Sequence, residues 1–219
     1  EAAATMLGGQ GSGWATMANG GRSGRDRGWV RPRAAAARCM VTLGTGVGGG
    51  VIVNGKVIDG THGAGGEIGH ITVDRHETAA CGCGKHGCLE QYSSATGVVR
   101  CMKKLLDENP DTPCTLRGTE FAAKDVFDAA RNGDALAARE VDEMTDTLGM
   151  ALANVANTVD PEMFMIGGGV SRAGEVLFAP LREHFKVYAF KSCRETPIVP
   201  AILGNDAGIY GSVRLIVGE

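Results

Sequence analysis

Three cysteines lie within eight residues, in the segment Cys81-Gly-Cys-Gly-Lys-His-Gly-Cys88. This spacing indicates a metal site rather than a disulfide framework. Three thiolates and one imidazole complete the tetrahedral shell of zinc, and such a closed shell is structural because no position remains for a catalytic water. Spacing leaves the histidine open between His70 and His76, with His70 slightly favoured, since the ring of His86 would have difficulty pointing into its own loop. The alternative is a set of reduced thiols without metal.

The bulk composition narrows the class of protein. The chain has 219 residues with 43% hydrophobic content, which is enough to build a core. Its net charge of -3 argues against a protein that grips nucleic acid. No run approaches the roughly 18 apolar residues that span a bilayer, and the given sequence does not start with a basic end followed by a hydrophobic stretch. We therefore expect a cytoplasmic protein with small-molecule or protein partners, without nucleic acid or membrane.

The first forty residues differ sharply from the rest. They contain nine Ala, eight Gly and six Arg, but only Leu7 and Val30 represent the Leu, Ile, Val and Phe that build cores. Such a segment cannot bury enough apolar surface to fold alone. We expect residues 1–40 to be a disordered or non-native leader, and prefer this to a basic arm for nucleic acid.

From Val41 onward the chain alternates strand and helix signals, which predicts an α/β architecture. Asn54-Gly55 between apolar runs indicates a hairpin, Asp160-Pro161 ends a long helix, and Ser171 is a plausible N-cap for a helix through about residue 185. The expected strands are 41–43, 51–53, 56–58, 163–166 and 198–203, with glycine turns at 44–50 and 167–169 and other helices at 94–106, 122–131, 135–159 and from 206.

The glycine-rich turn suggests a phosphate site. Gly44-Thr-Gly-Val-Gly-Gly49 satisfies G-x-G-x-x-G, but a hairpin follows where a dinucleotide fold requires a helix. The glycines would still let backbone N–H groups approach an anion, with the Thr45 hydroxyl as a further donor. The alternative is an ordinary tight turn between strands.

Four motifs together resemble one family. They are Leu-Gly-Thr-Gly-Val-Gly-Gly-Gly at 43–50, Gly-Ala-Gly-Gly-Glu-Ile-Gly-His at 63–70, the cysteine segment continued to Glu90, and Ile-Gly-Gly-Gly-Val-Ser at 166–171. Their order and separation are similar to the ROK family of sugar kinases and sugar-sensing repressors, in its glucokinase-like branch. The resemblance runs from Val41 to the end.

This resemblance implies the fold and the roles of particular residues. The family has the actin-like ATPase fold, a ribonuclease H-like α/β architecture, so residues 41–219 are expected to be mainly its C-terminal larger lobe, with a zinc loop over residues 70–90. The family's zinc ligands select His70, with Cys81, Cys83 and Cys88. By position, Glu67, His70 and Glu90 are expected to face the sugar. Thr45 and Gly46 would touch the ATP phosphates, Gly167, Gly168 and Gly169 the adenosine, and Mg²⁺ would accompany the nucleotide.

Two further family motifs are not found before Val41. Family kinases carry an Asp-x-Gly-Gly-Thr turn and an Asn-Asp pair whose Asp is the catalytic base, and residues 1–40 contain neither. Asn205-Asp206 lies at the far end and is not that pair. We expect the base to be absent from this chain and kinase activity to be impaired, with a frame or start error having replaced authentic residues.

The expected function is ATP-dependent phosphorylation of a hexose at its 6-hydroxyl, in carbohydrate metabolism and glycolysis. Glucose, converted to glucose 6-phosphate, is the first choice, and N-acetylmannosamine, fructose and other hexoses remain open. A homodimer is expected because family members commonly form one. One alternative is a sugar-sensing repressor, although residues 1–40 are too short and too poor in Leu, Ile and Val for a helix-turn-helix. The other alternative is an inactive sugar- and zinc-binding fragment.

Overall fold

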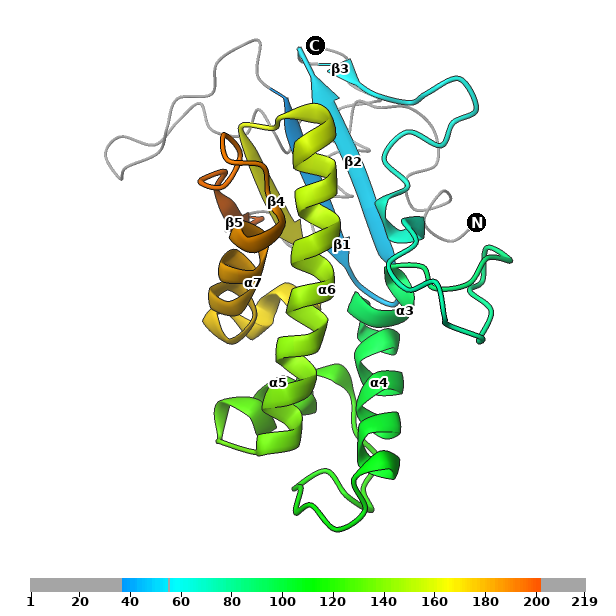
Figure 1. Ribbon diagram of the computed structural model, residues 1–219, viewed down its shortest axis with the longest axis vertical. Helices are drawn as coiled ribbons and strands as arrows, with labels where there is room; N and C mark the ends of the chain where they lie inside the picture. The colour runs from blue at the N-terminus through cyan, green and yellow to red at the C-terminus, as the bar shows by residue number, and fades with distance from the viewer. Residues whose placement is uncertain (1–36, 55, 202–219) are drawn as a thin grey trace, which may run out of the picture.

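Strand β1 (Arg38–Leu43) lies at the middle of a five-stranded sheet in the order β3-β2-β1-β4-β5. Figure 1 shows this arrangement in a computed structural model, which describes residues 37–54 and 56–201. The remaining elements are β2 (Val47–Val53), β3 (Lys56–Val57), η1 (Ile68–His70), α3 (Glu90–Ser93), α4 (Ala95–Glu108), α5 (Ala123–Arg131), α6 (Ala135–Val159), β4 (Met163–Gly167), η2 (Val170–Ala173), α7 (Glu175–Tyr188) and β5 (Ile198–Pro200).

The sheet is mixed. β1 pairs antiparallel with β2 and parallel with β4, and β4 pairs parallel with β5. β1 begins at Arg38, so residues 38–40, which composition had grouped with the leader, belong to the sheet. The buried Arg38 side chain is compensated by Glu162, whose Oε2 lies 3.3 Å from its Nε. Residues 1–36 of the expected leader lie outside the described residues.

The glycine turn is shorter than expected. Only residues 44–46 form the turn, and Gly48, Gly49 and Gly50 belong to β2. A Cβ on Gly49 would lie 2.3 Å from the carbonyl oxygen of Gly66, which shows how closely the segment before η1 approaches the strand. Glycine inside a strand commonly marks such an approach. The prediction of a turn through residue 50 was therefore wrong.

Three predicted helices are confirmed within two residues at each end, as α4, α5 and α6, whereas the short helix α3 was not predicted. α6 has 25 residues, and the Asp134 side chain caps its first turn by accepting from the N–H groups of Leu136 and Ala137. In Figure 1, α6 runs along one face of the sheet beside α7. Phe185 of α7 meets Phe164 of β4 edge to face, with ring centroids 5.7 Å apart. This contact ties the helical layer to the sheet.

The region after β4 differs from the prediction. α7 begins at Glu175, and its N-cap residue is Gly174 with φ 67° rather than Ser171. The hydroxyl of Ser171 donates instead to the carbonyl of Gly168, at 2.8 Å, within η2. Serine often makes such local backbone bonds in place of capping. The last strand is shorter than expected, and the helix expected from Asp206 lies outside the described residues.

None of the described helices is long and apolar enough to cross a membrane.

Candidate metal centre and ligand site

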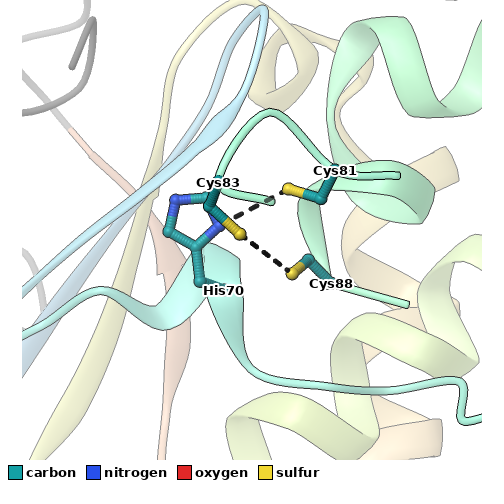
Figure 2. Close-up of side chains that lie close together, drawn as sticks. All are labelled: His70, Cys81, Cys83 and Cys88. Atoms are coloured by element: carbon teal, nitrogen blue, oxygen red, sulfur yellow. Dashed lines mark hydrogen bonds between the residues drawn. The ribbon is translucent and has the colours of Figure 1, made fainter. Parts of the chain in front are cut away.

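Figure 2 shows four side chains converging between η1 and the loop that precedes α3: His70, Cys81, Cys83 and Cys88. Their ligand atoms all lie within 4.8 Å of one another. The sulfur atoms of Cys83 and Cys88 are 3.6 Å apart, and that of Cys81 is 3.7 Å from Nδ1 of His70. A tetrahedral zinc with Zn–S bonds of about 2.3 Å has edges of about 3.8 Å. The donor set and its spacing therefore fit zinc.

His70 is the histidine that lies with the cysteines. His76 is exposed, and its backbone N–H donates to Asp74 at 2.8 Å in a local turn. Nδ1 of His70 faces Cys81, whereas its Nε2 lies 3.8 Å from Oε2 of Glu67. A ring that binds a metal through Nδ1 keeps an N–H at Nε2, which is free to donate to a carboxylate or a hydroxyl.

Backbone contacts shape the loop before α3. Bridges between Thr72 and Cys88 and between Ala80 and His86 fold it into a hairpin. Gly87 has φ 68°, and a Cβ there would lie 1.7 Å from the carbonyl oxygen of Asp74, so only glycine fits. These contacts bring cysteines from both arms of the hairpin to one point.

The thiols differ in their electrostatic setting. Burial raises the pKa of Cys81 to about 12. The backbone N–H of Lys85 lowers the pKa of the exposed Cys83 thiol. Zinc binds thiolates, so a metal here must displace the Cys81 proton, which a divalent cation does by its own charge.

Two carboxylates flank the cysteine cluster. Oε1 of Glu90, the first residue of α3, accepts from the Cys81 thiol at 2.9 Å and lies 3.7 Å from Nδ1 of His70. The Glu67 and Glu90 side chains are 36% and 24% exposed, so a ligand can reach both. The metal cluster and the predicted sugar-binding acids thus form one continuous site.

The same carboxylate borders the glycine turn. A Cβ on Gly46 would lie 2.8 Å from Oε2 of Glu90. The turn is held to the first turn of α4, where the N–H of Ala95 donates to the carbonyl of Gly44 at 2.8 Å and the Thr96 hydroxyl to that of Thr45 at 2.7 Å. Glu90 therefore joins the metal cluster to the turn predicted to bind phosphate.

The second glycine turn lies beside the first. Because β1 and β4 are parallel, with Thr42 opposite Gly167, their carboxyl ends meet at one edge of the sheet. Gly168 has φ 84°, and a Cβ there would lie 2.3 Å from the carbonyl oxygen of Leu43. Ligands of open α/β sheets bind outside the carboxyl ends of the strands. Residues 44–46 and 167–169 are therefore placed to share one ligand.

Comparison with known proteins identifies the family. Residues 33–219 match the model of the ROK family. The chain belongs to the ROK family. It is 45% identical over 181 residues to a glucokinase of Halalkalibacterium halodurans, covering 81% of this chain and 55% of that protein. It is 41% identical over 180 residues to a glucokinase of Thermotoga maritima, covering 80% and 56%. The chain thus spans about half the length of the curated relatives it matches.

Solved structures of ROK proteins share the fold. A ROK family glucokinase from Streptomyces griseus, in complex with glucose and AMPPNP, superposes with a TM-score of 0.72 at 34% identity, covering 84% of this chain and 61% of that one. A ROK family transcriptional regulator, a homologue of the E. coli MLC protein, gives 0.71 at 27%, covering 81% and 45%. The fold is the actin-like ATPase fold, as the resemblance to the ROK family implied.

A polar network behind the zinc loop of this ROK chain was not foreseen. The Tyr92 hydroxyl lies 2.9 Å from both Oδ2 of Asp74 and Oε2 of Glu77. Arg100 of α4 pairs with the same Glu77 oxygen at 2.7 Å and donates to the carbonyl of Gln91. The N–H of Ala79 and the Arg100 pair lower the pKa of Glu77 to about 2. The network fastens residues 74–79 to α3 and α4.

Proposed function

We propose that the protein to which this chain belongs phosphorylates a hexose at the expense of ATP, with glucose converted to glucose 6-phosphate. The position of Glu90 carries this proposal, because its carboxylate contacts Cys81 on one side and lies on the other where a Cβ on Gly46 would point. Phosphoryl transfer requires a hydroxyl held next to a phosphate. A sugar bound by Glu90 would lie next to a nucleotide bound by the glycine turn. The glucokinases that the chain resembles support the same substrate.

In this proposal, Glu67, His70 and Glu90 bind sugar hydroxyls. Carboxylates accept hydrogen bonds in fixed directions, and an analogue without the matching hydroxyl leaves an acceptor unpaired. The Nε2 atom of His70, 3.8 Å from Glu67, adds a donor between the acids. Glucose is the proposed hexose.

Zinc has a structural role in the proposal. His70, Cys81, Cys83 and Cys88 would hold it, and the ion would supply the positive charge that keeps three thiolates together. Four protein ligands leave no open position for catalysis. The metal centre fixes the hairpin, and the hairpin fixes the orientation of His70 and Glu90 toward the sugar.

The nucleotide is assigned to the two glycine turns. We infer that Thr45 and Gly46 contact the ATP phosphates and that Gly167, Gly168 and Gly169 lie against the adenosine. Thr45 and Gly169 are exposed at the shared sheet edge, which supports this arrangement. Mg²⁺ would accompany ATP and neutralise the phosphate charge.

Three further assignments complete the proposal. Residues 41–219 form the sugar- and nucleotide-binding domain, and the protein forms a homodimer. The 219-residue polypeptide by itself turns over slowly, because residues 1–40 contain no Asn-Asp pair to supply the base. A general base contributes about 10²–10⁴-fold to such a rate.

Ligand binding to the purified 219-residue chain tests the proposal more directly than turnover. Glucose and Mg-AMPPNP are titrated separately by calorimetry, zinc is quantified on the same sample, and glucose 6-phosphate formation is followed in a coupled assay. The proposal predicts one zinc per chain and binding of both ligands. Glucose binding without any nucleotide binding would contradict the kinase proposal and favour a sugar-sensing repressor domain. The likeness to the ROK transcriptional regulator, the MLC homologue, is the reason to consider that alternative. Binding of neither ligand would mean an inactive fragment.

A further inference from the structure

A cavity of about 350 Å³ lies apart from the zinc and sugar site, between α4, α6 and the outer part of the zinc loop. Its walls include Leu105 of α4, Met144 and Glu140 of α6, and Tyr92 of α3. None of the four candidate zinc ligands lines it, nor does Glu67 or Glu90. Its volume falls within the range of small-molecule sites.

Glu140 stands out among the charged groups of this cavity. It is 2% exposed, and its Oε1 is buried with no hydrogen-bond partner among the described residues. A buried carboxyl group without a partner is costly, so proteins usually pair one. An unpaired acid in the wall of a cavity points to a ligand that brings its own donor.

The other charged side chains that line the cavity each have an ion-pair or hydrogen-bond partner. Its three basic side chains each pair with a carboxylate: Arg100 with Glu77 at 2.7 Å, Lys104 with Glu108 at 3.8 Å and Arg139 with Glu143 at 2.7 Å. Of the three remaining acids, two accept from tyrosine hydroxyls: Asp74 from Tyr92 at 2.9 Å and Asp146 from Tyr188 at 2.8 Å. The third is Glu140. The acids that line the cavity therefore exceed the bases by three, and Glu140 is the member left without a partner.

The surroundings of Glu140 favour its neutral form in the free protein. Burial raises the pKa of this carboxyl to about 8, and the neighbouring Glu143 adds to the effect. Arg100 and Arg139 act in the opposite direction but are engaged with other acids. A cation arriving beside Glu140 would offset the cost of its charge.

An organic amine fits this cavity better than a metal ion. Within the described parts of the chain, the only group of three or more acids, histidines and cysteines that converge as metal ligands is the one at His70. The cavity is also far larger than an ion, and Leu105 and Met144 give it an apolar wall. A carbon chain that ends in an ammonium group matches both the charge and the wall.

We propose that this cavity binds a small primary amine, whose ammonium group pairs with the carboxylate of Glu140 while its carbon chain lies against Leu105 and Met144. This assignment does not depend on the kinase proposal. The polar network that fastens residues 74–79 to α3 and α4 also lines the cavity, through Tyr92, Asp74, Glu77 and Arg100. A bound amine would therefore contact that network.

Putrescine is the probe, and 1,4-butanediol is its uncharged control of the same length. Each is titrated into the purified chain by calorimetry up to about 10 mM, which covers millimolar dissociation constants. Putrescine is expected to bind at least about tenfold more tightly than the diol. The absence of putrescine binding, or equal binding of the two compounds, would overturn the proposal, and this comparison needs no variant.

Two variants then locate the binding. Glu140→Gln is expected to weaken the affinity for putrescine at least about tenfold. Glu143→Gln is the control, because Glu143 lines the same cavity but is paired with Arg139 and 54% exposed. It should change the affinity for putrescine less than about threefold. Circular dichroism checks that both fold. Equal weakening by both variants would mean general attraction to an acidic surface and would overturn the site. Binding that is unchanged in Glu140→Gln would do the same.

Discussion

Oε1 of Glu90 lies 2.9 Å from the sulfur of Cys81, so the first side chain of α3 bridges the candidate metal centre and the glycine turn. The proposed sugar site therefore depends on a hairpin that the metal would hold. Variants of Glu90 and of the metal ligands can therefore show whether sugar binding and metal binding are lost together or separately.

Glu90→Gln is expected to weaken glucose binding about ten- to a hundredfold while one zinc per chain is retained. The change removes a charged acceptor without changing its size, and a lost hydrogen bond of this kind costs about 1–3 kcal/mol. Calorimetry with glucose and zinc analysis on the same sample measure both quantities. Glu120→Gln is the control because its side chain is 96% exposed. Normal glucose affinity in Glu90→Gln would remove Glu90 from the sugar site.

Gly46→Ala should also weaken glucose binding, with little loss of stability. Its new Cβ would lie 2.8 Å from Oε2 of Glu90, and that flexible side-chain end can move aside, which displaces the proposed sugar contact. Gly44→Ala is the matched control in the same turn, because a Cβ there meets nothing within 4 Å. Glucose affinity and the melting temperature are compared for the two variants. Equal glucose affinity in both would show that the Glu90–Gly46 contact does not position the sugar.

Removal of one metal ligand is expected to destabilise the fold. Cys88→Ser replaces a fully buried thiol in the loop, so the chain should lose its zinc and its melting temperature should fall. A chelator should lower the melting temperature of the unchanged chain in the same way. Cys114→Ser, outside the loop and only partly buried, should keep its zinc. A Cys88→Ser chain that still holds one zinc would argue against the four-ligand site.

Much of the fold followed from local pattern. The apolar period of α6 and its end at Asp160-Pro161 defined that helix because each signal is contained in a few neighbouring residues, whereas its cap at Asp134 was not predicted. The ligand cluster could be foreseen for a similar reason. Three of its members are close in sequence, and spacing alone had left only the histidine open.

Features that depend on distant partners could not be predicted. Gly48–Gly50 read as part of a turn because the need for glycine comes from other segments, which no local pattern records. The Gly66 carbonyl approaches Gly49, and a Cβ on Gly48 would lie 2.7 Å from the Thr42 hydroxyl oxygen. Glu77 and Arg100 are 23 residues apart and of ordinary types, so nothing in the sequence marks them as a pair. Glu140 is similar, since a glutamate on a helix is usually exposed, whereas tertiary packing leaves this one 2% exposed.

The buried Glu140 predicts a pH dependence of stability. Its pKa is raised from an ordinary 4.5 to about 8, so between these values the folded chain keeps a proton that the unfolded chain releases. The free energy of unfolding should fall as pH rises through this window, by up to about 1.4 kcal/mol per pH unit, and level off above it. The groups that act on this carboxyl are Glu143 and Arg139 on α6 and Arg100 and Cys101 on α4.

Urea unfolding of Glu140→Gln beside the unchanged chain, from about pH 5 to 9, measures this effect. The variant has no proton to lose at position 140, so the difference between the two curves isolates that residue from the titrating histidines and cysteines. The variant should gain relative stability as pH rises. Parallel curves would mean that Glu140 ionises normally.

The last prediction concerns the network behind the zinc loop. Tyr92→Phe removes the hydroxyl that lies between Asp74 and Glu77, which leaves two carboxylates near each other without their shared donor. The free energy of unfolding should fall by about 1–2 kcal/mol, and a chelator should extract zinc faster because residues 74–79 are held less firmly. Tyr188→Phe is the matched control, since it loses a similar bond, 2.8 Å to Asp146, far along the chain from the loop. If both variants release zinc at the rate of the unchanged chain, the network stabilises the fold without supporting the metal centre.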